Sequence, residues 1–354
     1  MLKAIDFFCG AGGLTRGLLN AGISVVSGFD IDEASKETYE KNNKPSKFHA
    51  VDVCALDLGQ LRKLTRLRSF SDVVFVGCAP CQPFSQQRKS GPAKHSATLL
   101  LGFGRLVQAA RPRAVLIENV PGMARVRGYS TFRRFTRLLE TLGYKISFDI
   151  LDAKHFGVPQ TRRRLVLVAL KDLQPTLPSQ VFGTERRPFR TVRDAIEHFP
   201  EMEAGEIHEN VFNHVTASIT EVNLERLRHT PHDGGDRRAW PKRLFLDCHK
   251  GDYKGHTDVY GRMAWDQPAP TLTGRCHSIS NGRYGHPEQD RAISLREAAA
   301  LQSFPDRYEF VGTNKHVALQ IGNAVPVRFA EYLGRHLVKL LSESRKNTKR
   351  SKAA

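Results

Sequence analysis

Short apolar runs recur along the first half of the chain and alternate with stretches whose apolar residues follow a helical period. Such runs, bounded by glycine or polar residues, are typical of buried strands. They predict strands at 4–8, 24–29, 73–76, 114–117, 145–151 and 165–170, and a third strand that closes with Val51-Asp52-Val53. Helices are expected at 14–21, 98–110 and 132–142. This alternation predicts an α/β fold.

The pattern changes near Lys171, where prolines and arginines become frequent and the βαβ alternation stops. Residues 171–290 mix short apolar runs with loops rich in Gly, His and Arg, and predict a small, loop-rich second domain. A helix is then expected after Ser294, with Glu297 completing a capping box. We expect a tight turn at 320–326, a terminal helix at 326–341, and a disordered basic tail at 343–354.

Composition adds constraints on class and partners. A chain of 354 residues is long enough for two domains, and it has no long apolar stretch or signal-peptide pattern. We therefore expect a soluble, cytosolic protein, with its six cysteines free rather than paired. Histidines and Cys248/Cys276 lack the spacing of a metal site, so no metal is predicted. The net charge of +18 favours a polyanionic partner over a merely solubilising surface.

Cys81 lies on the stiff loop Cys78-Ala79-Pro80-Cys81-Gln82-Pro83, directly after the strand at 73–76. Open α/β sheets bind their ligands at the carboxyl ends of strands, which is where this thiol is placed. Three interpretations compete: a buried structural cysteine, a C-x-x-C redox pair with Cys78, or a nucleophile. Redox pairs start a helix directly after the motif, and Pro83 makes that less favourable.

Other chemistry-bearing residues follow neighbouring strands. A glycine turn, Cys9-Gly10-Ala11-Gly12-Gly13, follows the first strand, and carboxylates Asp30, Asp52 and Glu118 follow later ones. The glycine spacing is not G-x-G-x-x-G, so a dinucleotide is poorly supported. Instead the pattern suits an adenosine-type cofactor without a pyrophosphate. In an extended segment, Gln160, Arg162 and Arg164 alternate onto one face, and Arg163 points to the other.

Together these motifs resemble the DNA (cytosine-5)-methyltransferase family, of the bacterial restriction-modification type, over nearly the whole chain and in the family's order. The matching stretches are Asp6 to Gly13, Pro80-Cys81-Gln82, Glu118-Asn119-Val120, Gln160-x-Arg162-x-Arg164, Arg296-Glu297-Ala298-Ala299 and Gly322-Asn323-Ala324-Val325. The resemblance implies a doubly wound, Rossmann-like sheet with a smaller recognition domain. It implies a catalytic and cofactor-binding domain at 1–170, to which 311–342 returns, and a target-recognition domain at 171–310.

The resemblance also implies the chemistry: a methyl group from S-adenosylmethionine goes to C5 of a flipped-out cytosine in a specific double-stranded DNA sequence. Cys81 would attack C6, Glu118 would contact the base, and Arg164, with Arg162, would hold O2. The implied cofactor residues are Phe8, Gly10, Gly12, Gly13, Leu14, Asp30, Ile31, Asp52, Val53, Pro80, Leu99, Asn323, Ala324 and Val325. The enzyme would be a cytoplasmic monomer, with a cognate restriction endonuclease that acts on the same site without direct contact.

Two alternatives remain at this point. A tRNA cytosine-5 methyltransferase would use the same scaffold, although the long recognition region favours DNA. A redox enzyme would use Cys78 and Cys81 as a C-x-x-C pair. A plain DNA-binding module is the weakest interpretation, because it gives Cys81 and Glu118 no purpose.

Overall fold

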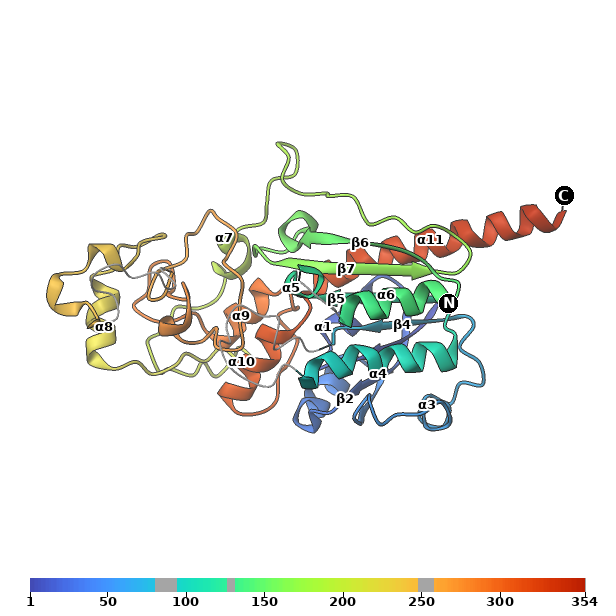
Figure 1. The fold of residues 1–354 in the computed structure, drawn as a ribbon. Helices are drawn as coiled ribbons and strands as arrows, with labels where there is room; N and C mark the ends of the chain where they lie inside the picture. The colour runs from blue at the N-terminus through green and yellow to red at the C-terminus, as the bar shows by residue number, and fades with distance from the viewer. Residues whose placement is uncertain (80–93, 126–130, 248–257, 354) are drawn as a thin grey trace. The chain divides into compact units, whose positions relative to one another are not determined.

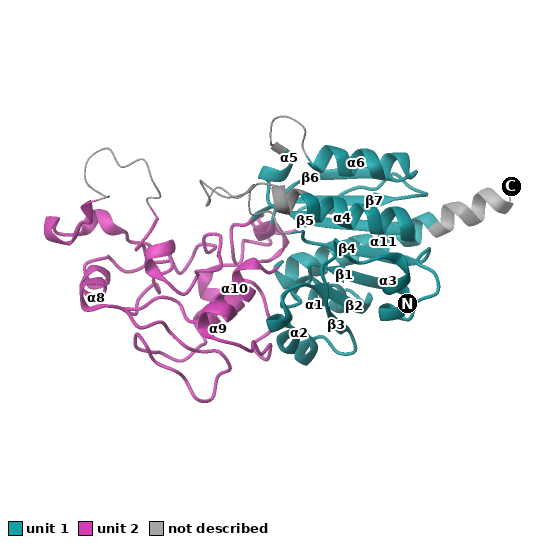
Figure 2. Ribbon diagram, turned by 60° about the horizontal axis from the view of Figure 1, so that its bottom comes forward, with its two compact units in different colours: residues 1–152, 163–180, 325–354 teal, residues 153–162, 181–324 magenta. Residues whose placement is uncertain are grey.

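The computed structural model describes residues 1–79, 94–125, 131–247 and 258–353, and the chain forms two compact units. Unit 1 comprises 1–152, 163–180 and 325–354, and unit 2 comprises 153–162 and 181–324 (Figure 2). These boundaries differ from the predicted ones: 153–162 and 311–324 belong to unit 2, and 171–180 to unit 1. The chain therefore passes between units at more places than the composition indicated.

Unit 1 is built on a seven-stranded sheet in the order β3-β2-β1-β4-β5-β7-β6 within the described residues. All of these strands are labelled in Figure 2, and Figure 1 shows the sheet from another side. Its strands are β1 Lys3–Phe7, β2 Ser24–Asp30, β3 Lys47–Ala50, β4 Val73–Gly77, β5 Ala114–Asn119, β6 Lys145–Asp152 and β7 Arg163–Leu170. The strands from β3 to β5 pair in parallel, whereas β7 pairs antiparallel with both β5 and β6. This confirms the predicted α/β fold with its Rossmann-like sheet.

Helices cover both faces of the sheet. They are α1 Gly13–Asn20, α2 Lys36–Asn42, α3 Leu58–Thr65, α4 Lys94–Ala110, α5 Gly122–Arg125, α6 Thr131–Thr141 and α11 Val327–Ala353. One face carries a core of Ile5, Phe7, Phe75 and Ile117 packed against α4 and α6, as period-two alternation along buried strands requires. On the other face α11 packs against α1, where a Cβ on Gly17 would meet Ala330 at 2.4 Å.

Several predicted boundaries in unit 1 were wrong, three of them with consequences for the site or the tail. The third strand ends at Ala50, so Val51-Asp52-Val53 lies beyond it. The strand at 114–117 continues through Glu118 and Asn119, because antiparallel β7 pairs with both residues. Helix α11 runs to Ala353 and so includes most of the segment for which a disordered tail was predicted.

Unit 2 contains short helices and isolated β-bridges rather than βαβ repeats in the part that the structure describes. Its helices are α7 Val192–Ile196, α8 Glu221–Arg228, α9 Leu295–Leu301 and α10 Asn314–Asn323, with the 3-10 helices η3 Ala153–Phe156, η4 Arg237–Ala239, η5 Lys242–Leu244 and η7 Ile279–Asn281. The 3-10 helix η1 Glu33–Ser35 lies in unit 1. The Ser294/Glu297 capping box of α9 is confirmed. The tight turn predicted at 320–326 was wrong, since α10 continues to Asn323.

Buried arginines organise unit 2. Arg262 donates to the carbonyls of Thr230, His286, Gln289 and Leu227, and Arg291 forms a buried ion pair with Glu297 at 2.7 Å. Such donors replace the backbone pairing that a sheet would supply, because buried carbonyls require partners. No helix in the described residues is long and apolar enough to span a membrane.

Candidate active site

The turn between β1 and α1 contains three residues with positive φ, a backbone conformation that glycine adopts most easily. Gly10 and Gly12 have φ values of 47° and 87°, and Phe8 has φ 62°, so β1 ends at Phe7 rather than at Phe8 as predicted. A Cβ added to Gly10 would meet nothing within 4 Å. No side chain caps the start of α1 at Gly13. The turn therefore leaves open space and backbone N–H groups beside the carboxyl end of β1.

Asp30, the last residue of β2, holds this turn in place. Its Oδ2 accepts a hydrogen bond from Gly10 N at 2.8 Å, and its Oδ1 accepts one from Asp32 N at 2.9 Å. Burial raises the pKa of Asp30, and these two backbone donors oppose the rise. The side chain of the neighbouring Ile31 is 74% exposed.

Asp52 lies just beyond β3 and accepts a hydrogen bond from Cys54 N at 2.8 Å. Val53 beside it is buried, while Gly13 and Leu14 are buried at the start of α1. The carboxyl ends of β1, β2 and β3 thus present a glycine turn and two carboxylates along adjacent strands, in the arrangement that the sequence predicted.

Asp6 lies within β1; it is part of the matching stretch Asp6 to Gly13, but no role of its own was predicted for it. It is fully buried, and its Oδ2 accepts a hydrogen bond from Thr15 Oγ1 at 2.7 Å. The chain of contacts continues from Thr15 to Tyr39 at 3.0 Å and from Tyr39 to Ser46 at 2.8 Å. Burial, with a smaller contribution from Asp30, raises the pKa of Asp6 to about 7. A carboxylate inside an otherwise apolar run was the signal that could have revealed it.

Glu118 is at the carboxyl end of β5 and is 2% exposed. Arg164 on β7 places its Nε 3.1 Å from Glu118 Oε1, and the Cys78 thiol donates to Oε2 at 2.8 Å. Asn119, the next residue, donates from its side-chain amide to the carbonyl of Ala79 at 2.8 Å. β5 therefore holds the residues that follow β4, which is the stretch that leads toward Pro80 and Cys81.

Gln160 and Arg162 do not share the surroundings of Arg164. Arg162 is 3% exposed and donates to the carbonyls of Leu272, Gly322 and Ala324, all within unit 2. Gln160 donates to Leu301 O and Gln302 Oε1 in the same unit. Arg164, in contrast, pairs with Glu118 in unit 1. The geometry supports a structural role for Arg162 and a role at Glu118 for Arg164.

The remaining predicted residues fall in different places. Pro80 and Cys81 lie outside the described residues. Leu99 is half-buried on α4. Asn323 and Ala324 belong to unit 2 and Val325 to unit 1, and their proposed contact with a cofactor stays a prediction. Arg296 is fully buried and donates to the carbonyls of Phe212, Pro305 and Tyr308, which gives it a structural role.

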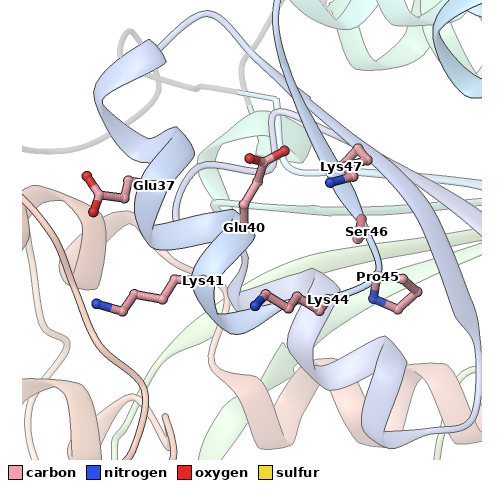
Figure 3. Close-up of a pocket in the computed structure, with 7 residues that line it drawn as sticks. All are labelled: Glu37, Glu40, Lys41, Lys44, Pro45, Ser46 and Lys47. Carbon is pink, nitrogen blue, oxygen red and sulfur yellow. The ribbon is translucent and has the colours of Figure 1, made fainter.

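A groove of about 530 Å³ in unit 1 lies away from these carboxyl ends (Figure 3). Its lining comes from α2 and from the turn that leads into β3: Glu37, Glu40, Lys41, Lys44, Pro45, Ser46 and Lys47. Because Lys47 is the first residue of β3, the groove borders the amino end of that strand rather than the end that precedes Asp52. None of the predicted site residues contributes to it.

Comparison with known proteins identifies the family. The sequence model of the C-5 cytosine-specific DNA methylase matches residues 2–339. A type II methylase, M.HgiDII of Herpetosiphon aurantiacus, is 39% identical over 342 residues and covers 95% of both chains. The type II methyltransferase M1.HphI of Haemophilus parahaemolyticus is 33% identical, over 96% of this chain and 87% of its own.

Solved structures share the fold. A putative DNA modification methyltransferase from an E. coli prophage superposes with a TM-score of 0.76 at 24% identity, covering 97% of this chain and all of its own. The Entamoeba histolytica methyltransferase EhMeth gives a TM-score of 0.65 at 16% identity, over 96% and 99% of the two chains.

Proposed function

Because the chain belongs to the C-5 cytosine-specific DNA methylase family, we propose that it methylates a flipped-out cytosine in one specific double-stranded DNA sequence, with Cys81 as the nucleophile. It is a DNA (cytosine-5)-methyltransferase that uses S-adenosylmethionine and acts on DNA. The finer statements about the covalent bond, base flipping and sequence choice are the proposal. One observation supports the assignment of the catalytic residues: Glu118, Arg164 and Cys78 meet at the end of β5, beside the strand that leads to Cys81.

The described residues fit an adenosine-type cofactor with no pyrophosphate. Gly10 leaves open space where a side chain would otherwise lie, and the start of α1 offers uncapped backbone donors. Asp30 and Asp52 provide acceptors for hydroxyl and amine groups, and the exposed Ile31 provides an apolar surface for a flat ring. S-adenosylmethionine supplies an electrophilic methyl group at such a site.

A thiol and a carboxylate are the residue types that methylation of cytosine C5 requires. Cytosine C5 is too weak a nucleophile to accept a methyl group directly, and addition of a thiolate at C6 makes C5 enamine-like. We assign that addition to Cys81, whose free pKa of about 8.5 calls for basic surroundings. Glu118 would contact N3 and the exocyclic amine and hold the base in position as sulfur adds. Once C5 carries the methyl group, a base removes the C5 proton and the sulfur–C6 bond breaks.

Arg164 would stabilise the Glu118 carboxylate and would also bind the cytosine. Its guanidinium lies beside the buried Glu118 carboxylate and supplies the countercharge that burial demands. Its Nη1 donates to Arg163 O, so the proposed contact with the cytosine O2 would fall to Nη2. The assignment of O2 binding to Arg162 as well is less well supported, because Arg162 donates to three carbonyls of unit 2.

Reaching C6 requires the cytosine to leave the duplex, which costs a few kcal/mol of unstacking and unpairing. Phosphate contacts made by a protein with a net charge of +18 would offset this cost without sequence preference. Sequence choice would fall to residues 181–290 of unit 2, through contacts with base edges.

The relatives named type II methylases support a place in a restriction-modification system. A cognate endonuclease would act on the same DNA site without contacting this protein, and the enzyme would work as a monomer. Bisulfite sequencing of DNA from cells that express the protein tests the function, because it reports product and site together. Purified tRNA is the matched control substrate. The proposal would be refuted if tRNA incorporated methyl groups while DNA remained unmethylated.

A further inference from the structure

Cys78 is the first residue after β4, and its side chain turns toward the neighbouring strand β5. Its thiol donates to Glu118 Oε2 at 2.8 Å, and its backbone N–H donates to Phe7 O at 3.3 Å. The residue is thus anchored to strands on both sides of β4. A thiol can donate one hydrogen bond, and here the Glu118 carboxylate accepts it.

The two carboxylate oxygens of Glu118 have different neighbours. Oε2 accepts from Cys78, whereas Oε1 lies 3.1 Å from Arg164 Nε. Within the described part of the chain, no group makes a well-formed hydrogen bond to Oε1. A 2% exposed carboxylate with one bonded oxygen and one oxygen free of hydrogen bonds is oriented to accept a further donor at Oε1.

We propose that Cys78 is a positioning residue for methyl transfer: its thiol fixes the Glu118 carboxylate so that Oε1 faces the cytosine. This inference rests on the proposed contact of Glu118 with the base. Cys78 itself neither contacts the substrate nor bonds to it. A fixed carboxylate matters because a shift of about 1 Å in a catalytic group can lower a rate about a hundredfold.

A hydrogen bond from Asn119 keeps the loop after β4 attached to β5 independently of Cys78. The Asn119 amide donates to Ala79 O at 2.8 Å, so the chain that leaves β4 remains tied to β5 when the Cys78 thiol is removed. Cys78 is only partly buried, which limits the cavity that its truncation leaves. We therefore expect the variants at this position to fold.

The test compares Cys78→Ala, which removes the donor, with Cys78→Ser, which keeps a donor of similar size. Loss of one hydrogen bond to a charged group corresponds to about a tenfold to hundredfold lower kcat for Cys78→Ala. Because Cys78 touches no substrate, KM for DNA and for S-adenosylmethionine should change less than about threefold. Cys78→Ser should recover kcat to within about threefold of the parent protein. The parent, both variants and the control are assayed by single-turnover methylation, with melting temperatures measured in parallel.

Cys54→Ala is the control for loss of a thiol, since the Cys54 thiol donates to Thr98 O and the variant keeps the backbone N–H that bonds Asp52. A Cys78→Ala protein with the parent's kcat would overturn the inference, and so would a Cys78→Ser protein as slow as Cys78→Ala. Glu118→Gln separates this from the proposed function. If Glu118→Gln is slow while Cys78→Ala is not, the positioning role alone fails. If Glu118→Gln keeps full activity, the proposed contact of Glu118 with the base fails first.

Discussion

The carboxylate of Asp30 accepts a hydrogen bond from the backbone N–H of Gly10 at 2.8 Å, which joins the end of β2 to the glycine turn after β1. Residues twenty positions apart in the sequence therefore shape one loop. The second carboxylate oxygen of Asp30 accepts from Asp32 N, so one side chain orders the loops after both β1 and β2. In the proposed cofactor site, this side chain would couple loop geometry to ligand binding.

Asp30→Ala should weaken S-adenosylmethionine binding about tenfold to a hundredfold, because it removes both a ligand acceptor and the support of Gly10. DNA affinity should remain nearly unchanged. Calorimetric titration with the cofactor and an equilibrium DNA-binding assay measure the two constants. Glu37→Ala, which removes an exposed carboxylate on α2, is the control. An unaltered cofactor constant in Asp30→Ala would exclude Asp30 from the binding site.

Cys81→Ser should abolish methylation while cofactor binding persists. A hydroxyl has a much higher pKa than a thiol and does not add to C6 at neutral pH. Methyl incorporation and calorimetry on the same preparation measure both properties. Retention of more than a few per cent of the parent's rate would contradict the assignment of Cys81 as nucleophile.

Stability should depend on pH through Asp6. Its pKa rises from 3.8 to about 7 on folding, so the folded protein keeps a proton that the unfolded chain releases between those values. The contribution of Asp6 to the free energy of unfolding should therefore fall as pH rises from about 4 to about 7, by an amount on the order of a few kcal/mol. His286, whose pKa burial lowers to about 4, contributes with the opposite sign. Asp6→Asn should remove the Asp6 contribution, because the amide does not ionise, so its stability relative to the parent in urea unfolding should increase with pH.

The control for this measurement is a carboxylate outside the surroundings of Asp6. Thr15 donates to the Asp6 carboxylate, while Asp30 contributes a like charge and burial of the site dominates. Asp149→Asn, at an exposed position on β6, should leave the pH dependence as it is in the parent protein. Equal slopes in Asp6→Asn and the parent would show that Asp6 does not titrate in this range.

Arg162 and Arg164 should differ when each is replaced by alanine. Arg162→Ala leaves three buried carbonyls of unit 2 without their donor and should lower the free energy of unfolding by about 2 to 4 kcal/mol. Arg164→Ala should also lose stability, because it leaves the buried Glu118 carboxylate without its cation, but it should lower kcat far more than Arg162→Ala does. Urea unfolding and single-turnover kinetics on both variants distinguish the roles. The assignment is wrong if the two variants lose stability and rate in the same proportion.

Exchange of residues 181–290 for the equivalent segment of a related methylase should move the methylated site and leave the chemistry intact. The reason is that unit 2 has its own buried arginine network and the Glu118 cluster lies in unit 1. Bisulfite maps of parent and chimera provide the measurement. A folded, active chimera that retains the parent's site would show that this segment does not read sequence.

Local sequence patterns determined much of this protein. Apolar runs of buried strands, the positive-φ glycines after β1 and the Ser294/Glu297 capping box each depend on residues close in the chain, so they were predictable. The same holds for the placement of Asp30 at the end of β2 and of Asp52 just beyond β3, because the carboxyl ends of parallel strands lie at one edge of the sheet.

Tertiary structure alone decided the contacts between distant elements. Period-two alternation placed Arg162 and Arg164 on one face, but the chain passes from unit 2 to unit 1 between them and gives them different partners. Antiparallel pairing with β7 drew Glu118 into β5, and adjacency of β4 and β5 brought the Cys78 thiol to its carboxylate. Burial raised the pKa of Asp6. Pairing partner, burial and unit membership depend on residues far apart in the sequence, so no local pattern contains them.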